Sequence, residues 1–565
     1  MSRGKDGAMR GVRFQQSQEV DFVIVGSGAA GGVIAKQLAV AGFSVVVLEQ
    51  GPRIEAHEFR HDEYETFWGG SYSNHPSTQP QSFKAGPDAP VEAGGGTWVT
   101  GTAGVGYHRL VGGGSVMFTA NYWRFKPIDF MERSVWGAIP GTGLEDWPIT
   151  YEELEPYYTQ AEWDLGVSGE PGPFDPYRSR PYPLPPLPVK SSGVLFERGA
   201  RALGLNPQVA PMCIISEPYK GRSACLHCGY CGGFGCEHRA KSSTLFTTIP
   251  DAEATGRCEI RPESYVSQIA MNAQGRTTGV LYFDADRVEH LQRARAVVVC
   301  ANGAETPRLL LNSHTSRFPD GLANSSGHVG KYLMFNGNAG TNGVFERPLN
   351  EWKSVMVTRM IWDYYDSDPA RGFYGGGGID ARFWGGYPIF FGLGDYLPPG
   401  SPMWGREFRR LLSHNYSRTM NADVHTTSLP VETNRIELDP DLVDDWGLPC
   451  MRVTYKDHPD DLAMLAFLAQ IATDIMDEAG ALQTWKPDNF EQRAGVHLLG
   501  TCRMGDDPNA SVVDKFHRTH DVPNLFLCDG SSMVTGGRGQ PTCTIQALAY
   551  RAADHIGQFA RRGEI

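Results

Sequence analysis

The chain opens with two short apolar runs that flank a glycine-rich turn and a stretch of small side chains. Residues 21–25 and 44–48 are apolar runs of strand length. Residues 29–41 are mostly small or apolar, as in a helix packed closely against a sheet. This order of apolar runs predicts a strand, a helix and a second strand, which together form a βαβ unit.

The turn of this predicted unit carries a dinucleotide-binding pattern. Gly26, Gly28 and Gly31 form G-x-G-x-x-G, and Glu49 ends the second strand. In such a turn the first glycine permits the tight bend, the second lets the backbone approach a pyrophosphate, and the third lets helix and strand pack closely. A terminal acid accepts hydrogen bonds from ribose hydroxyls. A glycine-rich loop without a ligand is the alternative, and the unit alone does not distinguish NAD from FAD.

Two later apolar runs predict further buried strands. Residues 297–300 lead into a predicted helix that starts at Thr306 and Pro307, a capping residue followed by a proline suited to the first turn. Residues 525–528 lead directly to Asp529. An acid at the end of a buried strand is suited to hold a ligand, although a simple helix cap would explain it too.

Length and charge narrow the class of protein. The chain has 565 residues, which is too long for one hydrophobic core and predicts two interwoven domains. Its net charge of −13 argues against nucleic acid and anionic lipid as partners. No apolar run is long enough to span a bilayer, and the polar first residues lack the apolar region of a secretory signal.

Segments 20–51, 107–124, 297–313 and 497–546 together resemble the glucose–methanol–choline (GMC) family of FAD oxidoreductases, in the same order along the chain. The resemblance implies an α/β fold: a Rossmann-like FAD-binding domain with an interwoven α+β substrate domain built on an antiparallel sheet. It also implies that the following residues contact FAD, on the flavin-side loop and at the ribityl and pyrophosphate groups: Gly113, Ser115, Asn121, Asp529 and Gly530.

We expect the two domains to be discontinuous in sequence, and residues 434–455 to form a strand pair of the substrate-side sheet. The FAD-binding domain would comprise residues 16–60, 97–165, 225–335 and 495–565. The substrate-side domain and its insertions would comprise residues 61–96, 166–224 and 336–494.

Two residues are candidates for the chemistry. Oxidation of an alcohol by hydride transfer to flavin requires a base for the hydroxyl proton, and histidine suits that role. His497 opens the segment HLLGTCRMG, which resembles the family segment carrying the catalytic histidine; a structural histidine is the alternative. Gln540 occupies the position where the family usually has a second histidine or an asparagine. Its amide still donates and accepts hydrogen bonds, but the longer side chain changes the reach.

A cysteine-rich segment lies in the middle of the chain. Cys225, Cys228, Cys231 and Cys236 have the spacing C-x2-C-x2-C-x4-C. The opening triplet is similar to ferredoxin patterns for iron–sulfur clusters, whereas a structural zinc or disulfides are alternatives. The segment resembles the catalytic subunits of bacterial FAD sugar dehydrogenases, which implies a 3Fe–4S cluster in preference to 4Fe–4S. Three cysteines would suffice, and the sequence does not identify the fourth as ligand or spectator.

The resemblance therefore predicts an FAD-dependent dehydrogenase that oxidises a secondary alcohol of a sugar or glycoside. Glycoside 3-dehydrogenases, which make 3-keto sugars, are the branch it resembles most, with fructose, gluconate and polyol dehydrogenases close to it. An oxidase that reduces O2 to peroxide and a non-redox lyase of the same family are the rival functions. We expect the FAD to be non-covalent because residues 116–120 contain no histidine or cysteine, although His108 lies nearby.

The same resemblance implies partners. Related catalytic subunits are exported already folded with a small subunit that carries a twin-arginine signal, and they pass electrons to a cytochrome-type acceptor. A periplasmic location reached by co-export is the corresponding expectation. A cytoplasmic enzyme with a soluble electron carrier is the alternative.

Overall fold

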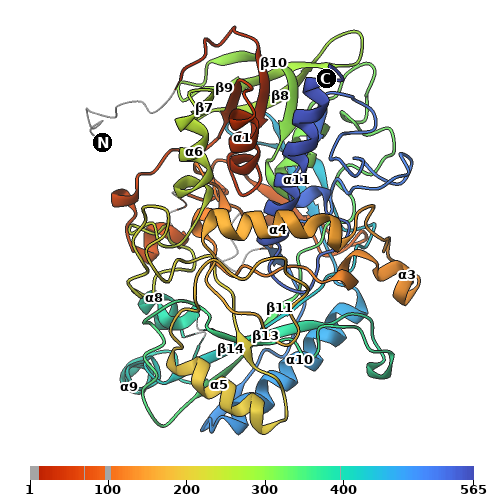
Figure 1. Ribbon diagram of the computed structural model, residues 1–565. Helices are drawn as coiled ribbons and strands as arrows, with labels where there is room; N and C mark the ends of the chain where they lie inside the picture. The colour runs from red at the N-terminus through yellow and green to blue at the C-terminus, as the bar shows by residue number, and fades with distance from the viewer. Residues whose placement is uncertain (1–11, 69, 71, 96–102, 383, 395) are drawn as a thin grey trace.

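The computed structural model describes residues 12–68, 70, 72–95, 103–382, 384–394 and 396–565. The chain forms two lobes, each built on its own sheet, with helix α4 (Tyr151–Leu165) lying across the middle (Figure 1). The upper lobe in that view holds both the first strand, β1 (Val20–Val25), and the end of the chain. This architecture confirms the predicted α/β class with a Rossmann-like part and a second, sheet-based part.

The first lobe is a mixed sheet in the order β7-β2-β1-β10-β9-β8, with β19 paired to β10. Strands β1, β2, β7, β19 and the end of β10 run parallel, while the start of β10 pairs antiparallel with β9. The parallel strands are buried along their length, which explains their unbroken apolar runs. The strands are β1 (Val20–Val25), β2 (Val45–Leu48), β7 (Cys258–Arg261), β8 (Tyr265–Met271), β9 (Thr277–Phe283), β10 (Glu289–Val299) and β19 (Leu525–Leu527).

Helices cover this sheet. Helix α1 (Gly31–Val40) packs against α6 (Thr248–Ala254) and the C-terminal helix α11 (Thr542–Arg561), and α11 also packs against α4. The βαβ prediction is confirmed, with a helix that begins two residues later than expected. The flavin-side segment, residues 112–120, contributes the short helix α2 (Gly114–Met117).

The helix after β10 differs from its predicted start. Helix α7 (Asn302–Asn312) begins at Asn302, four residues before Thr306, and Pro307 lies inside it. The Asn302 side-chain oxygen accepts hydrogen bonds from the backbone N–H groups of Ala304 and Glu305, so it satisfies the first turn in place of Thr306. The prediction of a start at Thr306 and Pro307 was therefore wrong.

The second lobe is a six-stranded sheet in the order β17-β11-β14-β13-β12-β6. Helix α10 (Pro459–Glu478) packs on β14 and β11, and α5 (Ser191–Ala202) packs on α10 and β12 (Figure 1). The strands are β6 (Gln208–Val209), β11 (Asn338–Val344), β12 (Arg359–Ile361), β13 (Gly377–Arg382), β14 (Thr419–Thr426) and β17 (Gln483–Trp485).

The strand pair predicted between residues 434 and 455 is present, but in a different sheet. Strands β15 (Arg435–Val443) and β16 (Pro449–Thr454) pair antiparallel. They belong to a separate four-stranded sheet with β3 (Gln81–Lys84) and β4 (Glu92–Gly94). The other edge of β16 pairs in parallel with β3, which comes from early in the chain. The hydrophobic pattern of residues 434–455 alone could not reveal this partner.

The remaining elements are small. They comprise α3 (Glu132–Trp136), α8 (Pro388–Gly392), α9 (Gly405–Asn415) and the two-stranded sheet of β5 (Gly104–Val105) with β18 (Ala494–Gly495). Over the described residues, none of the helices combines the length and apolar composition needed to cross a bilayer.

Candidate functional site

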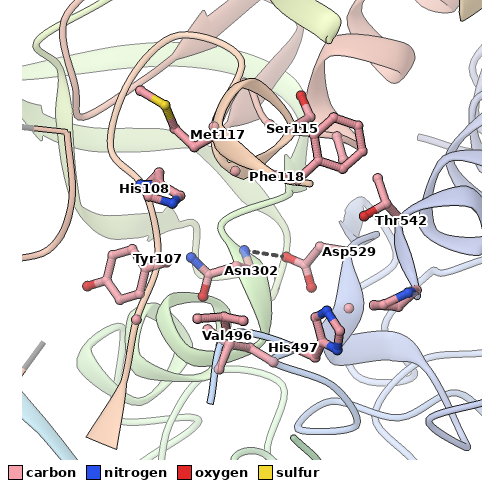
Figure 2. Close-up of a pocket in the computed structure, with 18 of the residues that line it drawn as sticks. Tyr107, His108, Ser115, Met117, Phe118, Asn302, Val496, His497, Asp529 and Thr542 are labelled. Carbon is pink, nitrogen blue, oxygen red and sulfur yellow. Dashed lines mark hydrogen bonds between the residues drawn. The ribbon is translucent and has the colours of Figure 1, made fainter. Parts of the chain in front are cut away.

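A cavity of about 530 Å³ lies between the two lobes. The first lobe contributes the glycine turn, the end of β2 and the start of α7, whereas the second contributes residues of β13 and β14. Residues 494–499 and the turn after β19 also line the cavity, and in Figure 2 Asp529 lies between His497 below it and Ser115 and Phe118 above it. The volume is in the range of cofactor-binding sites.

The glycine turn forms one end of the cavity. Gly26 has a φ of +92°, and a Cβ there would lie 2.5 Å from the Cys300 carbonyl oxygen. Gly113, with a φ of +54°, would place a Cβ 2.8 Å from the Cα of Gly28. Gly31 does not line the cavity; a Cβ there would lie 2.0 Å from the Gly26 carbonyl oxygen, so it serves helix packing. The backbone of this turn therefore carries no side chains at the point where a pyrophosphate would approach.

Glu49 lines the cavity at the end of β2 but already has protein partners. Its carboxylate accepts hydrogen bonds from the Ser27 N–H at 3.0 Å and the Ser27 hydroxyl at 2.7 Å, and from the Gly51 N–H at 3.1 Å. Burial raises the pKa of this carboxyl, and those hydrogen bonds oppose the rise. A carboxylate offers about four acceptor positions, so capacity remains for ribose hydroxyls.

Asp529 connects β19 to α7. One carboxylate oxygen accepts from the Asn302 N–H at 3.0 Å (Figure 2). The same oxygen accepts from the Thr306 hydroxyl at 2.6 Å. The other accepts from the Ser531 N–H at 2.8 Å, which caps the short 3-10 turn Gly530–Ser532. The residue therefore caps a turn and also lines the cavity together with Gly530.

The flavin-side candidates differ in their placement. Ser115 lines the cavity, and its hydroxyl donates to the Gly112 carbonyl at 2.7 Å. Asn121 is buried behind that segment, outside the residues that line the cavity, and its amide atoms have no hydrogen-bond partner among the described residues. A flavin-contacting role for Asn121 therefore stays a prediction.

His497 and Gln540 both line the cavity and hydrogen-bond each other. Burial lowers the pKa of His497 to about 4, and the nearby His425 and Arg382 lower it too, while a hydrogen bond with Gln540 acts in the other direction. His497 is therefore neutral at neutral pH and available as a base.

The sequence interpretation missed the polar wall supplied by the second lobe. His425 on β14 and Arg382 on β13 line the cavity, with Asp380 directly behind them. All three side chains are almost fully buried. The signal was a polar alternation, at residues 380 and 382 of β13 and at 421, 423 and 425 of β14, which puts these side chains on one face of a sheet.

His108, the nearby residue that left the flavin linkage in question, also lines the cavity. Its Nδ1 lies 3.1 Å from the Ser73 hydroxyl, and burial lowers its pKa to about 4.

The cysteine-rich loop lies beside the main cavity. All four cysteines line one small void of about 20 Å³. The Sγ of Cys225 accepts the His227 N–H at 3.3 Å, and burial raises the pKa of that thiol to about 11. Within the described ranges no three His, Cys, Asp or Glu side chains are arranged to hold a metal ion. The four thiols thus lie around one void, but among the described residues they are not arranged to coordinate a metal ion.

The same loop contacts the flavin-side segment. The Gly233 N–H donates to the Met117 carbonyl at 2.7 Å, and Gly233 lines the main cavity. Lys241 donates to the carbonyls of Phe118 at 2.8 Å and Phe234 at 2.7 Å. The loop is therefore in direct contact with the wall of the cavity.

The residues of the main cavity fit FAD. A dinucleotide needs bare backbone at a turn, an acid for the ribose and a long cavity, and the glycine turn, Glu49 and Asp529 supply these features. A substrate bound beside His497 and Gln540 would lie against the reactive ring of the flavin.

Comparison with known proteins agrees with this geometry. Sequence profiles of the GMC oxidoreductase family match residues 20–335 and 430–549. The 2-methyl-1,2-propanediol dehydrogenase of Mycolicibacterium austroafricanum is 34% identical over 563 residues, covering 96% of each chain. The fructose dehydrogenase large subunit of Gluconobacter japonicus is 29% identical over 578 residues, covering 97% of this chain and 99% of the other. The crystal structure of pyridoxine 4-oxidase from Mesorbium loti shares the fold, with a TM-score of 0.63 at 18% identity and coverage of 95% and 99%.

Proposed function

The chain belongs to the GMC oxidoreductase family, and we propose that it is a dehydrogenase oxidising a secondary alcohol of a sugar or glycoside. Family membership establishes an FAD-dependent oxidoreductase acting on CH–OH groups. The observation that carries the narrower proposal is the polar wall around His497, which combines a neutral base with a row of hydrogen-bonding side chains.

Bound FAD would supply the hydride acceptor, taking the C–H hydrogen with its electron pair. His497 takes the hydroxyl proton as the C–O bond becomes a carbonyl, because its ring is neutral at neutral pH. Gln540 hydrogen-bonds His497 and would orient its ring for this transfer, since the amide supplies both a donor and an acceptor.

The polar residues that line the cavity outside the glycine turn support the proposed substrate class. Asn338, Arg382 and Gln492 all line the cavity. A polyhydroxylated substrate presents alternating donors and acceptors, and buried polar groups of this kind favour ligands that pair with them. The fructose dehydrogenase relative supports a sugar by its name. A product with the carbonyl at carbon 3 is the regiochemistry we propose.

A substrate panel tests this function. The flavin-loaded protein is mixed anaerobically with sugars, glycosides, polyols and simple alcohols, and the loss of oxidised-flavin absorbance is followed. We expect sugars or glycosides to bleach the flavin fastest, and product analysis to locate the new carbonyl at carbon 3. Bleaching by simple alcohols alone would refute the sugar assignment, and no bleaching at all would favour the lyase.

We further propose that electrons leave through an iron–sulfur cluster on the loop of Cys225, Cys228, Cys231 and Cys236, with 3Fe–4S preferred. The support is that these cysteines line one void next to the flavin-side segment, where backbone N–H groups and the Lys241 cation favour negative charge. We expect iron and acid-labile sulfide to co-purify, and Cys231→Ser to lose both while flavin reduction persists. Stoichiometric zinc without sulfide, or peroxide formation matching turnover in air, would refute the relay.

A cluster implies a one-electron acceptor. We propose a cytochrome-type partner and a periplasmic location reached with a small twin-arginine-signal subunit. Fractionation of cells that express the chain with and without this subunit tests the location. Activity confined to the cytoplasm in both cases would favour the soluble-carrier alternative.

A further inference from the structure

A line of polar side chains joins strand β13 to the reacting end of the cavity. Asp380 Oδ2 lies 2.7 Å from Nε2 of His425, and Nδ1 of His425 lies 3.3 Å from the Gln540 amide nitrogen. Gln540 in turn hydrogen-bonds His497. Asp380 and His425 are 0% and 3% exposed, so these contacts are shielded from water.

The position of the proton on His425 follows from its neighbours. Arg382 Nη2 lies 2.9 Å from the same Nε2, but this nitrogen also donates to Asp380 Oδ2, and the Nε of Arg382 donates to Asp380 Oδ1 at 2.7 Å. A hydrogen bond to a carboxylate is charge-assisted and stronger than a neutral one. We therefore assign the proton to Nε2, which donates to Asp380.

In the neutral imidazole of His425 the other nitrogen then accepts. Its two neighbours are the amide nitrogens of Gln540 at 3.3 Å and of Asn338 at 3.5 Å, so Gln540 is the closer donor. With its NH2 group directed to His425, Gln540 presents its carbonyl oxygen to His497. A carbonyl oxygen only accepts, so the facing nitrogen of His497 must carry the ring proton.

We propose that His425 is a positioning residue that fixes the orientation of the Gln540 amide and thereby the tautomer of His497, leaving the second ring nitrogen of His497 free to take the substrate proton. This inference rests on the proposed role of His497 as the base. Without an acceptor at position 425, the Gln540 amide is free to flip. Its NH2 group would then face His497 and select the wrong tautomer.

A double-mutant cycle tests this dependence. His425→Leu removes the acceptor, Gln540→Leu removes the amide, and the combined variant removes both. We expect the rate constant of flavin reduction to fall about 10- to 100-fold in His425→Leu, the range for a misplaced catalytic group, with KM nearly unchanged. The double variant should be no slower than Gln540→Leu alone, because His425 acts only through Gln540. If the two substitutions instead lower the rate constant independently, so that their fold-losses multiply in the double variant, the proposal is overturned.

Two further variants separate positioning from folding. His425→Gln keeps an acceptor oxygen near the Gln540 amide. It should recover at least half of the loss that His425→Leu causes in the logarithm of the rate constant. Equal losses in His425→Gln and His425→Leu would contradict the proposal. His290→Leu is the matched control, because His290 forms a 2.7 Å pair with Asp284 outside the cavity. It should leave flavin reduction unchanged.

A second readout does not depend on turnover. Diethyl pyrocarbonate acylates unprotonated imidazole nitrogens, so its rate of reaction at His497, followed by peptide mass spectrometry, reports on the nitrogen that faces the cavity. We expect a fast reaction in the wild type and His290→Leu and a slow one in His425→Leu; equal rates would refute the tautomer assignment. If no alcohol bleaches the wild-type flavin, the proposed function fails, while this measurement still decides the inference.

Discussion

Replacement of His497 by alanine tests the base at the end of the cavity. The structure lowers the pKa of this side chain to about 4, chiefly by burial, so at pH 7 only about one molecule in a thousand carries the proton. Loss of a positioned general base costs about two to four orders of magnitude in rate. At about 1.36 kcal/mol for each tenfold change, this corresponds to roughly 3–5 kcal/mol of transition-state stabilisation.

The assay is stopped-flow reduction of bound flavin under anaerobic conditions. We expect His497→Ala to retain FAD and to reduce it about 100- to 10,000-fold more slowly. His328→Ala is the control, because His328 lies outside the cavity and contacts the Asn509 carbonyl. Near-normal reduction in flavin-loaded His497→Ala would assign the base elsewhere.

The pH dependence of the wild-type enzyme provides an independent check. A depressed pKa keeps the base neutral to lower pH, so the acid limb of kcat/KM should fall near pH 4. At pH 5 roughly nine-tenths of such a group is neutral, against about 3% of an unperturbed histidine. An acid limb near pH 6.5 would refute the burial argument.

Three other outcomes are expected. Gly31→Val should yield protein without FAD, measured by the flavin-to-protein absorbance ratio, because its Cβ would lie 2.0 Å from the Gly26 carbonyl oxygen; full occupancy would contradict the packing role. Acid precipitation should release the yellow colour, since no His or Cys occupies residues 116–120, whereas colour retained on the protein would indicate a covalent link, with His108 the residue to examine. Burial raises the pKa of Asp457 to about 6, so folding favours its protonated form and the free energy of unfolding falls as pH rises through 6. Asp457→Asn should therefore raise Tm at pH 8, and this gain should disappear near pH 4. The same gain at both pH values would disprove the linkage.

Local signals predicted one side of the site well. The turn of Gly26, Gly28 and Gly31 and the acid Glu49 are contiguous in sequence, so the spacing of these residues is enough to define a βαβ unit. His497 was identified by its segment and does line the cavity. In both cases the chemistry depends on residues close together in the chain.

The other side of the site depended on contacts between residues that are far apart in the sequence. Asp380 and Arg382 reach His425 only because β13 and β14 are neighbours in a specific register, and Gln540 reaches His425 from another part of the chain. The start of α7 was misjudged for a related reason. Thr306 looked like a cap, but it is bonded to Asp529 from far along the sequence, while Asn302 satisfies the first turn.

Strand β19 has a consequence for biosynthesis. It is only three residues long, it pairs parallel with β10, and Asp529 and Gly530 of the cavity wall follow it closely. During translation the glycine turn emerges early, but Asp529 and Gly530 are missing from the cavity wall until the segment that follows β19 leaves the ribosome. A chain that terminates before β19 would therefore expose the apolar edge of β10 and lack Asp529 and Gly530, so cofactor capture should occur only after β19 and the residues that follow it have been made.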